Sequence, residues 1–526
     1  MHAILRLSPE QRGLVVSTAT SATPSSLQWT ADDGAVIDAA FESSDTIRIR
    51  GAGLELRLAD AAAVLTPFTG TYFFQDPLDG SAIFTSYETG RRYRVTAISG
   101  ELEFEGAELL GDGQRAVVAG GGNWELAIEE FDGARSAYLA TTPFDDIVAK
   151  SAEGFDAYLE AIAGWRSAFA PAAELAVYVL WSATVEPRGF LGRESILMSK
   201  HWMDKVWSWD HCFNALAVAP GNAALALDQL LVPFDHQDAS GALPDSVAHS
   251  EVLYNFVKPP IHGWALARLR EFTTIDRVWL GDFYPRLARW TEFWLESRRV
   301  AGHPLPHYQH GNDSGWDNST VFDQDRLIES PDLAAFLIVQ LEVLAQLADE
   351  LDIDGAQRWR SHRDALVTAL LGLWQGESFV AKAVTSGRPS STGSLLLLLP
   401  IVATDHLPVD VAHKLAQLVA GHLTEYGLAT QRTDTPEYEP DGYWRGPIWA
   451  PSTILIEDGL RRAGEVALAD QVSDTFRGLC ERSGFAENFD ALTGAGLRDR
   501  AYTWTASAYL MLARAAEQRA VASRTL

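Results

Sequence analysis

Residues 331–351 read PDLAAFLIVQLEVLAQLADEL, a stretch dominated by apolar side chains. Leu333, Phe336, Leu337 and Leu341 recur at intervals of three and four, which places them on one face of an α-helix. The stretch therefore predicts an amphipathic helix whose apolar face packs into a core.

The same periodicity continues from Ser151 to the C-terminus. It predicts helices over residues 152–169, 171–185, 209–219, 222–234, 260–272, 275–299, 331–351, 355–374, 392–399, 409–423, 450–463, 465–483 and 502–518. Short and long connections alternate between them, as in an (α/α)6 barrel, where inner and outer helices alternate and long loops gather at one mouth. We expect the chemistry in these long, Trp-rich loops.

The first part of the chain has a different pattern. Residues 54–58, 92–98 and 101–105 alternate apolar and polar side chains, which is typical of strands. Turn signals separate such segments at Asp79-Gly80, Thr89-Gly90, Asp112-Gly113 and Asp132-Gly133. We predict an antiparallel β-sandwich over residues 1–150, followed by an all-α (α/α)6-barrel domain over residues 151–526.

The composition limits the partners of the chain. Its 526 residues include 70 acidic and 42 basic side chains, a formal net charge of -28. This charge repels nucleic acid and anionic membranes, so we expect neither as a partner. Residues 1–22 lack the apolar core of a secretory signal, and we expect a cytoplasmic protein. The oligomeric state stays open.

Several kinds of chemistry lack their motifs. The sequence has no dinucleotide or phosphate-binding glycine motif, no metalloprotease motif and no serine-nucleophile elbow. Its 13 histidines are scattered without metal-ligand spacing. Cys212 and Cys480 are far apart and predict buried thiols rather than a disulfide framework. We expect no cofactor and no catalytic metal.

Carboxylates beside aromatic residues remain as the candidate chemical groups. In residues 310–320, HGNDSGWDNST, Asp317 follows Trp316 in a loop between two predicted helices. An apolar ring and a second acid, Asp313, would both raise the pKa of Asp317, as suits a general acid. The alternative is an Asp-Asn-Ser segment that only caps the next helix. In residues 484–494, GFAENFDALTG, Glu487 lies among aromatic residues and suits a general base; the alternative is a surface acid.

Three further motifs place aromatic walls at helix starts. They are residues 443–449, YWRGPIW, residues 207–213, WSWDHCF, and residues 502–505, YTWT. Flat indole faces and carboxylates suit the C–H faces and hydroxyls of a sugar, so these motifs favour a small carbohydrate as the partner. The alternatives are an N-cap for Asp210 and core positions for the tryptophans.

These motifs together resemble glycoside hydrolase family 63, and most closely its mannosylglycerate and glucosylglycerate hydrolase-type (MGH1-like) members, with a more distant resemblance to the family 37 trehalases. The resemblance implies an (α/α)6 barrel and an inverting exo-hydrolase of a terminal α-linked glucose or mannose. It also implies Asp317 as the general acid and Glu487 as the general base. The residues expected to contact the sugar are Trp209, Asp210, Trp316, Tyr443, Trp444, Arg445, Trp449 and Trp504.

The chain also departs from that family. Residues 310–315, HGNDSG, stand where many members have His-Pro-Trp-Glu-Ser-Gly, and Thr320-Val321 stand where many have Pro-Arg. The aglycone is therefore left unassigned. Alternatives on a similar barrel are a trehalase, an α-L-rhamnosidase and a sugar epimerase that uses histidines; a non-catalytic carbohydrate-binding protein is a further one.

Overall fold

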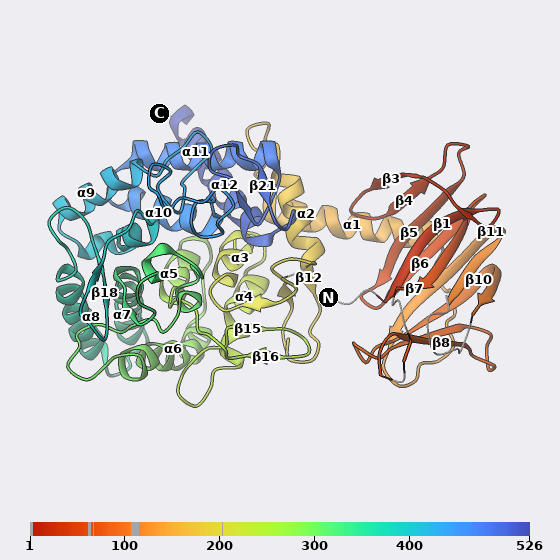
Figure 1. Cartoon of the computed structure of the whole chain (residues 1–526), viewed down its shortest axis with the longest axis horizontal. Helices are drawn as coiled ribbons and strands as arrows, with labels where there is room; N and C mark the ends of the chain where they lie inside the picture. The colour runs from red at the N-terminus through yellow and green to blue at the C-terminus, as the bar shows by residue number, and fades with distance from the viewer. Residues whose placement is uncertain (1–3, 62–64, 67, 107–114, 202, 526) are drawn as a thin grey trace. The chain divides into compact units, whose positions relative to one another are not determined.

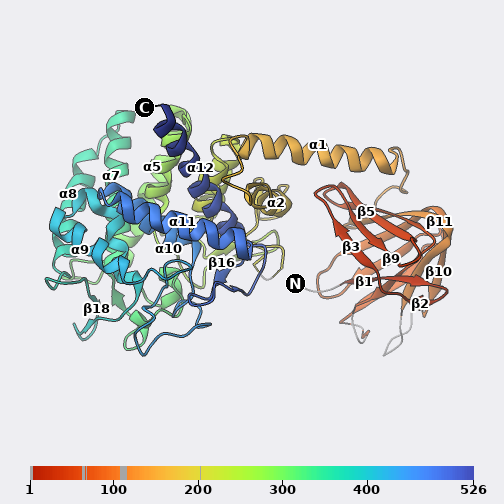
Figure 2. The same cartoon turned by 90° about the horizontal axis from the view of Figure 1, so that it is seen from above.

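The computed structural model describes residues 4–61, 65, 66, 68–106, 115–201 and 203–525. The chain divides into two compact units, Met1–Tyr158 and Leu159–Leu526 (Figures 1 and 2). The division falls inside helix α1 (Phe144–Ala163), which begins earlier than the helix predicted over residues 152–169. Two acids, Asp145 and Asp146, occupy its first turn and favour a helix start there.

The first unit is an antiparallel sheet. Within the described residues its eleven strands are β1 (Leu5–Gln11), β2 (Leu14–Val15), β3 (Ala19–Ala22), β4 (Leu27–Thr30), β5 (Val36–Ser43), β6 (Thr46–Ala52), β7 (Glu55–Asp60), β8 (Thr71–Gln75), β9 (Ala82–Ser86), β10 (Arg92–Glu105) and β11 (Ala116–Phe131). The central order is β2-β1-β7-β11-β6-β5-β4-β3, and β10 joins β11 to the β9–β8 hairpin. The strands predicted at 92–98 and 101–105 are one long strand, β10. The turn predicted at Asp112-Gly113 lies outside the described residues.

The sheet curves around one core because its two longest strands bend. The register of β10 shifts between Ala97 and Glu101, and β11 contains three consecutive glycines at 120–122. Before these glycines β11 pairs with β7, and after them it pairs with β6. Trp124 follows the bend and lies in the core, where its indole N–H donates to the Leu54 carbonyl at 2.7 Å.

The second unit is helical. Its helices are α2 (Ala173–Ala183), α3 (His211–Val218), α4 (Ala223–Asp235), α5 (His262–Phe272), α6 (Arg277–Glu292), α7 (Pro331–Leu351), α8 (Ala356–Leu371), the 3-10 helix η4 (Leu395–His406), α9 (Val409–Ala420), α10 (Ala450–Arg462), α11 (Val466–Ser483) and α12 (Thr503–Thr525). Short strands between them are β12 (Thr184–Val185), β13 (Ser195–Ile196), β14 (Val206–Trp207), β15 (Ser246–Val247), β16 (Val252–Leu253), β17 (Ile328–Glu329), β18 (Ala381–Ala383), β19 (Pro389–Ser390), β20 (Asn488–Phe489) and β21 (Gly496–Leu497).

These helices form a closed double ring. Neighbours in the inner ring contact one another in the cycle α3, α5, α7, η4, α10, α12 and back to α3. Helices α2, α4, α6, α8, α9 and α11 lie outside this ring and alternate with the inner helices along the chain. The sequence predicted an antiparallel β-sandwich followed by an (α/α)6 barrel. The antiparallel first unit and the helical ring are confirmed, and the strands of the first unit form one continuous sheet.

Two helices differ locally from their predictions. The helix expected over residues 275–299 ends as α-helix at Glu292 and continues as a π-helical turn, η1 (Phe293–Ser297). The helix expected over residues 392–399 is η4, which begins at Leu395, runs to His406 and contains Pro400. The segment winds as 3-10 helix, Pro400 lacks the N–H of a regular helix, and the backbone departs from helical geometry at Ala403.

Helix α7 is long and apolar enough to cross a membrane by length and composition, but 83% of its most apolar window is buried inside the protein. Its apolar character is therefore accounted for by its place in the inner ring. Cys212 and Cys480 are both buried free thiols, as predicted.

Substitution of Gly51 tests the packing of the first core. A Cβ at Gly51 would lie 2.3 Å from the Trp124 ring, and this indole cannot retreat without losing its bond to Leu54. We expect Gly51→Ala to lower the free energy of unfolding of this unit by about 2 kcal/mol, or roughly 4–8 °C in a calorimetric scan. Gly133→Ala, where a Cβ meets nothing within 4 Å, is the control and should leave the transition unchanged.

Candidate active site

The candidate residues come from loops that precede inner helices. Asp210 precedes α3, Asp317 lies before α7, residues 443–449 lead into α10, and Glu487 lies before α12. Because each outer helix returns the chain, the inner helices all begin at the same end of the ring. Their preceding loops therefore meet at one mouth, although the residues are far apart in sequence.

The loop that carries Asp317 is tied to two other mouth loops. Gly315 has φ of +70°, and a Cβ there would lie 2.5 Å from the Trp209 ring. The Asn318 amide donates to the Gly442 carbonyl at 3.0 Å and accepts from the Trp444 N–H at 3.0 Å. Both polar atoms of Asn318 are thus used to hold the loop.

A buried lysine lies beside the Asp317 carboxylate. The Lys258 ammonium is 3.8 Å from Asp317 Oδ1 and 3.2 Å from Asp245 Oδ1, and it donates to the Asn312 carbonyl at 2.8 Å. Sequence reasoning missed both Lys258 and Asp245. Asp245 is buried in this ion pair, whereas the next acid along the chain, Glu251, pairs with Lys205 near the surface.

Asp313, which was expected to act on Asp317, has a structural role. Its carboxylate accepts from Arg298 at 2.7 Å and from the backbone N–H groups of Gln309, at 2.8 Å, and Val257, at 3.2 Å. These bonds fix the fold of the loop between α6 and α7.

Glu487 is held by backbone contacts on both sides. Its N–H donates to the Asp499 carbonyl at 2.8 Å, and its carbonyl accepts from the Trp504 indole at 3.4 Å. Two residues later, Phe489 exchanges both backbone hydrogen bonds with Ile448. Burial raises the pKa of the Glu487 carboxyl to about 7, against an opposing effect of Arg498. The alternative of an exposed surface acid is excluded.

Asp210 does not cap α3. It stands at the N-cap position, but its side chain makes no capping hydrogen bond. Its Oδ2 is buried and lacks a hydrogen-bond partner among the described residues. Burial raises the pKa of Asp210 to about 8, whereas Lys258 lowers it. A buried carboxyl with an unused oxygen can accept or donate a hydrogen bond to a ligand hydroxyl.

The predicted aromatic residues form one cluster. Trp444 and Trp449 stack with ring centres 4.1 Å apart, and Trp504 stands edge-on to Trp449 at 5.3 Å. Trp316 packs on Trp444 at 4.7 Å, Tyr443 on Trp449 at 5.0 Å, and Trp209 on Trp504 at 6.1 Å. The cluster is largely buried, so only its edges can reach the mouth.

The charges of three candidate carboxyls act on the Tyr443 hydroxyl. Burial raises the pKa of the Tyr443 hydroxyl well above its ordinary value, and the charges of Asp317, Glu487 and Asp210 raise it further. These carboxyls come from separate loops, and their charges all act on the same hydroxyl.

Arg445 differs from the other predicted contact residues. Its guanidinium pairs with the Asp323 carboxylate and lies 4.0 Å from Glu439. In this structure it joins the loop before α10 to the loop that follows Asp317. A contact of Arg445 with substrate stays a prediction.

The histidines near the mouth are engaged by the backbone. Nε2 of His262 bonds to the Ser208 carbonyl at 2.9 Å, and His211 bonds to the carbonyls of Ile196 and Trp207. Burial lowers the pKa of each to about 4. These two neutral, buried imidazoles do not support the histidine chemistry of the epimerase alternative. Within the described ranges, no three His, Cys, Asp or Glu side chains are arranged to hold a metal ion.

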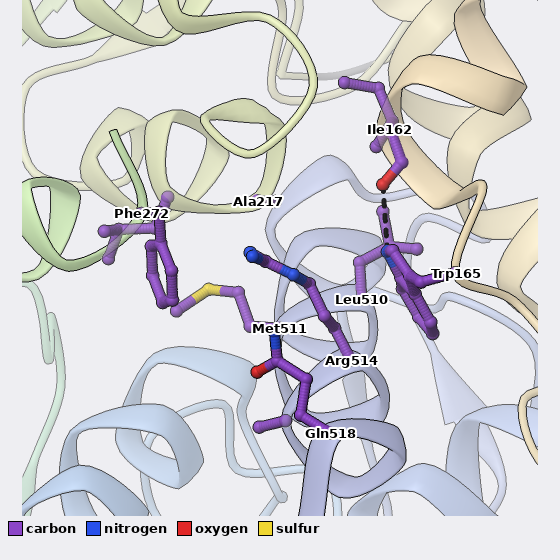
Figure 3. A pocket seen from close by; sticks show the side chains of 10 residues that line it. Ile162, Trp165, Ala217, Phe272, Leu510, Met511, Arg514 and Gln518 are labelled. Atoms are coloured by element: carbon purple, nitrogen blue, oxygen red, sulfur yellow. Dashed lines mark hydrogen bonds between the residues drawn. The ribbon is translucent and has the colours of Figure 1, made fainter. Parts of the chain in front are cut away.

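Figure 3 shows a pocket that lies along α12 and whose lining includes none of these carboxyls. It is lined by Ile162, Trp165, Leu216, Ala217, Phe272, Leu510, Met511, Arg514, Ala515 and Gln518. Arg514 lies 4.8 Å from the Phe272 ring centre and is the one ionisable residue of this lining. Without a carboxylate, this pocket cannot perform paired proton transfers.

Known proteins share this helical unit. A family model described as the mannosylglycerate hydrolase MGH1-like glycoside hydrolase domain matches residues 203–505. Mannosylglycerate hydrolase of Rubrobacter radiotolerans is 24% identical over 399 residues, covering 58% of this chain and 89% of that protein. Mannosylglycerate hydrolase MGH1 of Selaginella moellendorffii is 33% identical over 388 residues, covering 57% and 78%.

A solved structure agrees with the fold. The crystal structure of the family 63 mannosylglycerate hydrolase from Thermus thermophilus in complex with Tris matches with a TM-score of 0.59 at 22% identity, covering 65% of this chain and 99% of that one. The ring of helices and the family match define a glycoside hydrolase. The chain belongs to the MGH1-like glycoside hydrolases of family 63.

The buried Glu487 predicts a pH-dependent effect on stability. Its pKa in the folded protein, about 7, lies above the ordinary pKa of 4.5. The folded state therefore loses stability as the pH rises from about 4.5 to about 7, because the buried carboxyl must then carry a charge. Glu487→Gln removes that cost. We expect the variant to equal the wild type below about pH 4.5 and to be more stable by about 3 kcal/mol near pH 8.

Urea unfolding at several pH values measures this difference. Glu425→Gln, at an exposed position, is the matched control. A stability difference for Glu487→Gln that stays constant with pH would contradict the buried, proton-binding carboxyl.

Proposed function

We propose that the enzyme is an inverting exo-α-glycosidase that releases a terminal α-linked glucose or mannose from a small glycoside. The observation that carries this proposal is that Asp317, Glu487 and Asp210, from three loops at the same end of the helical ring, all act electrostatically on Tyr443, which packs on the stacked tryptophans. The family resemblance supports the α-linked sugar, and the names of the relatives support a small, polar aglycone.

In the proposed reaction Asp317 donates its proton to the glycosidic oxygen as the bond to the anomeric carbon breaks. Glu487 removes a proton from a water molecule that attacks the opposite face of that carbon. The configuration inverts in this single displacement. Asp210, whose Oδ2 has no protein hydrogen bond among the described residues, binds sugar hydroxyls, and the edges of Trp444 and Trp504 pack on the ring.

The stereochemistry is tested by proton NMR during the first minutes of reaction with a panel of α-glucosides and α-mannosides. We expect the β-anomer of the released sugar to appear before mutarotation mixes the two forms. The panel also identifies the sugar. Early release of the α-anomer would require a retaining mechanism, with Glu487 as a nucleophile rather than a base.

Two substrates with different leaving groups distinguish the catalytic role of Asp317 from that of Glu487. Asp317→Asn and Glu487→Gln should each lower kcat/KM for a natural glycoside by a factor of at least about 1000. An α-glycosyl fluoride needs no protonation of its leaving group, so Asp317→Asn should retain much more activity on the fluoride, whereas Glu487→Gln should not. Asp354→Asn, at an exposed position, is the control. The opposite pattern would exchange the two roles.

The pH profile gives an independent test of the base. Burial raises the pKa of Glu487 to about 7, and a general base must be ionised to act. We therefore expect kcat/KM to fall about tenfold per pH unit below about pH 7. If Glu487 were the acid instead, the same group would produce the alkaline limb of the profile.

A further inference from the structure

The most unusual charge in the site belongs to Lys258. It lies in the loop between β16 and α5, in the sequence Val257-Lys258-Pro259-Pro260, and only 5% of the residue is exposed. Its position is fixed by the bond to the Asn312 carbonyl, by Asp245, and by the face of Trp207, whose ring centre lies 5.7 Å from Nζ. Lysine is seldom buried unless paired, so this placement is costly.

Lys258 is surrounded by carboxyls from several elements. Asp245 from the loop before β15, Asp317 from the loop before α7 and Asp210 from the start of α3 all raise its pKa through their charges. Beyond Asp317, the cluster continues to Tyr443 and Glu487.

The neighbouring cations are engaged elsewhere. Arg298 bonds to Asp313 at 2.7 Å. Arg498 lies 2.8 Å from Asp441 and bonds to Asn488 at 3.0 Å. Among the described residues, Lys258 is the cation that forms an ion pair with Asp317, with Nζ 3.8 Å from Oδ1.

We propose that Lys258 is a positioning residue of the glycosidase site, which orients Asp317 and stabilises the negative charge that forms on it as its proton passes to the glycosidic oxygen. This inference rests on the proposed function. In that step the proton leaves Asp317, the bond from the anomeric carbon to the leaving oxygen breaks, and a bond to the attacking water oxygen forms while Glu487 takes the water proton. Lys258 keeps its own protons throughout.

Lys258 suits this role because negative charge develops on Asp317 during the reaction, next to an ammonium group whose position is already fixed. A preoriented charge in a water-poor site stabilises a transition state without reorganisation. The ammonium also explains why Asp245 is buried nearby, since Asp245 holds Lys258 in place and shares its charge. A merely structural Lys258–Asp245 pair would not require the ammonium to lie within 4.0 Å of Asp317 as well.

The test compares leaving groups in Lys258→Gln, whose amide can still donate to the Asn312 carbonyl. We expect kcat/KM to fall about 100-fold for the natural glycoside and less than about tenfold for the α-glycosyl fluoride, because only the first needs the proton of Asp317. Lys258→Arg should recover most of the lost activity. Lys205→Met, which removes the surface lysine paired with Glu251, is the matched control and should change neither rate.

A second readout is the pH profile. Lys258 lowers the pKa of both Asp210 and Asp245. Without it Asp210 and Asp245 hold their protons to higher pH, so the kcat/KM profile of the variant should differ from that of the wild type and move toward higher pH. Lys258→Met, tested in the same way, serves if Lys258→Gln does not fold.

The outcomes are distinct. Equal losses on both substrates, with an unmoved pH profile, would make Lys258 structural and overturn the inference. Unchanged activity of Lys258→Gln would overturn it too. Neither result affects the proposed function, which fails separately if the wild type cleaves no α-glycoside or if Asp317→Asn shows no preference for the fluoride.

Discussion

Closure of the inner helical ring is the constraint on which the rest of this structure depends. The last helix, α12, must pack against both α2 and α3 near the start of the helical unit. The Asn214 side chain joins the two ends, since its amide donates to Thr503 at 3.1 Å and its oxygen accepts from Ser507 at 2.8 Å. Asn214 and Thr503 are both buried, so their hydrogen bond replaces hydrogen bonds to water. It can form only when the ring is closed.

Ring closure also creates the site. Asp210 and Trp504 belong to the two helix starts that the closure brings together, and Trp209 meets Trp504 across it. The mouth therefore forms only when the ring closes. Carboxyls that would repel one another in a flexible chain are instead fixed by neutral anchors such as Asn318 and the backbone pairing of Ile448 with Phe489. Burying these carboxyls lowers the free energy of unfolding, as is usual for sites that bury charge.

The sequence predicts the architecture better than the site, because periodicity is a local property. Helix α7 begins and ends where its apolar pattern does. In α6, by contrast, the apolar pattern continues past Glu292 and does not reveal the change from α-helix to π-helix there. Asp317, Glu487 and the tryptophans are conspicuous as acids beside aromatic residues in long loops. Lys258 is not, since a lysine before two prolines looks like a solvent-exposed turn until the folded chain brings the charges of three carboxyls close to it. Arg445 presents the opposite case, because its aromatic motif predicts contact with substrate whereas its charge is satisfied by an acid that no local pattern reveals.

The parallel pair of Trp444 and Trp449 has an optical consequence. Two indoles with ring centres 4.1 Å apart and planes inclined by only 6° share their electronic excitation, and the edge-on Trp504 lies within reach of the same coupling. Such a pair has a near-ultraviolet circular dichroism and an emission spectrum that differ from those of isolated tryptophan. Because the pair spans the loop that leads into α10 and the start of that helix, its spectrum reports, without any added label, on the packing of this part of the ring.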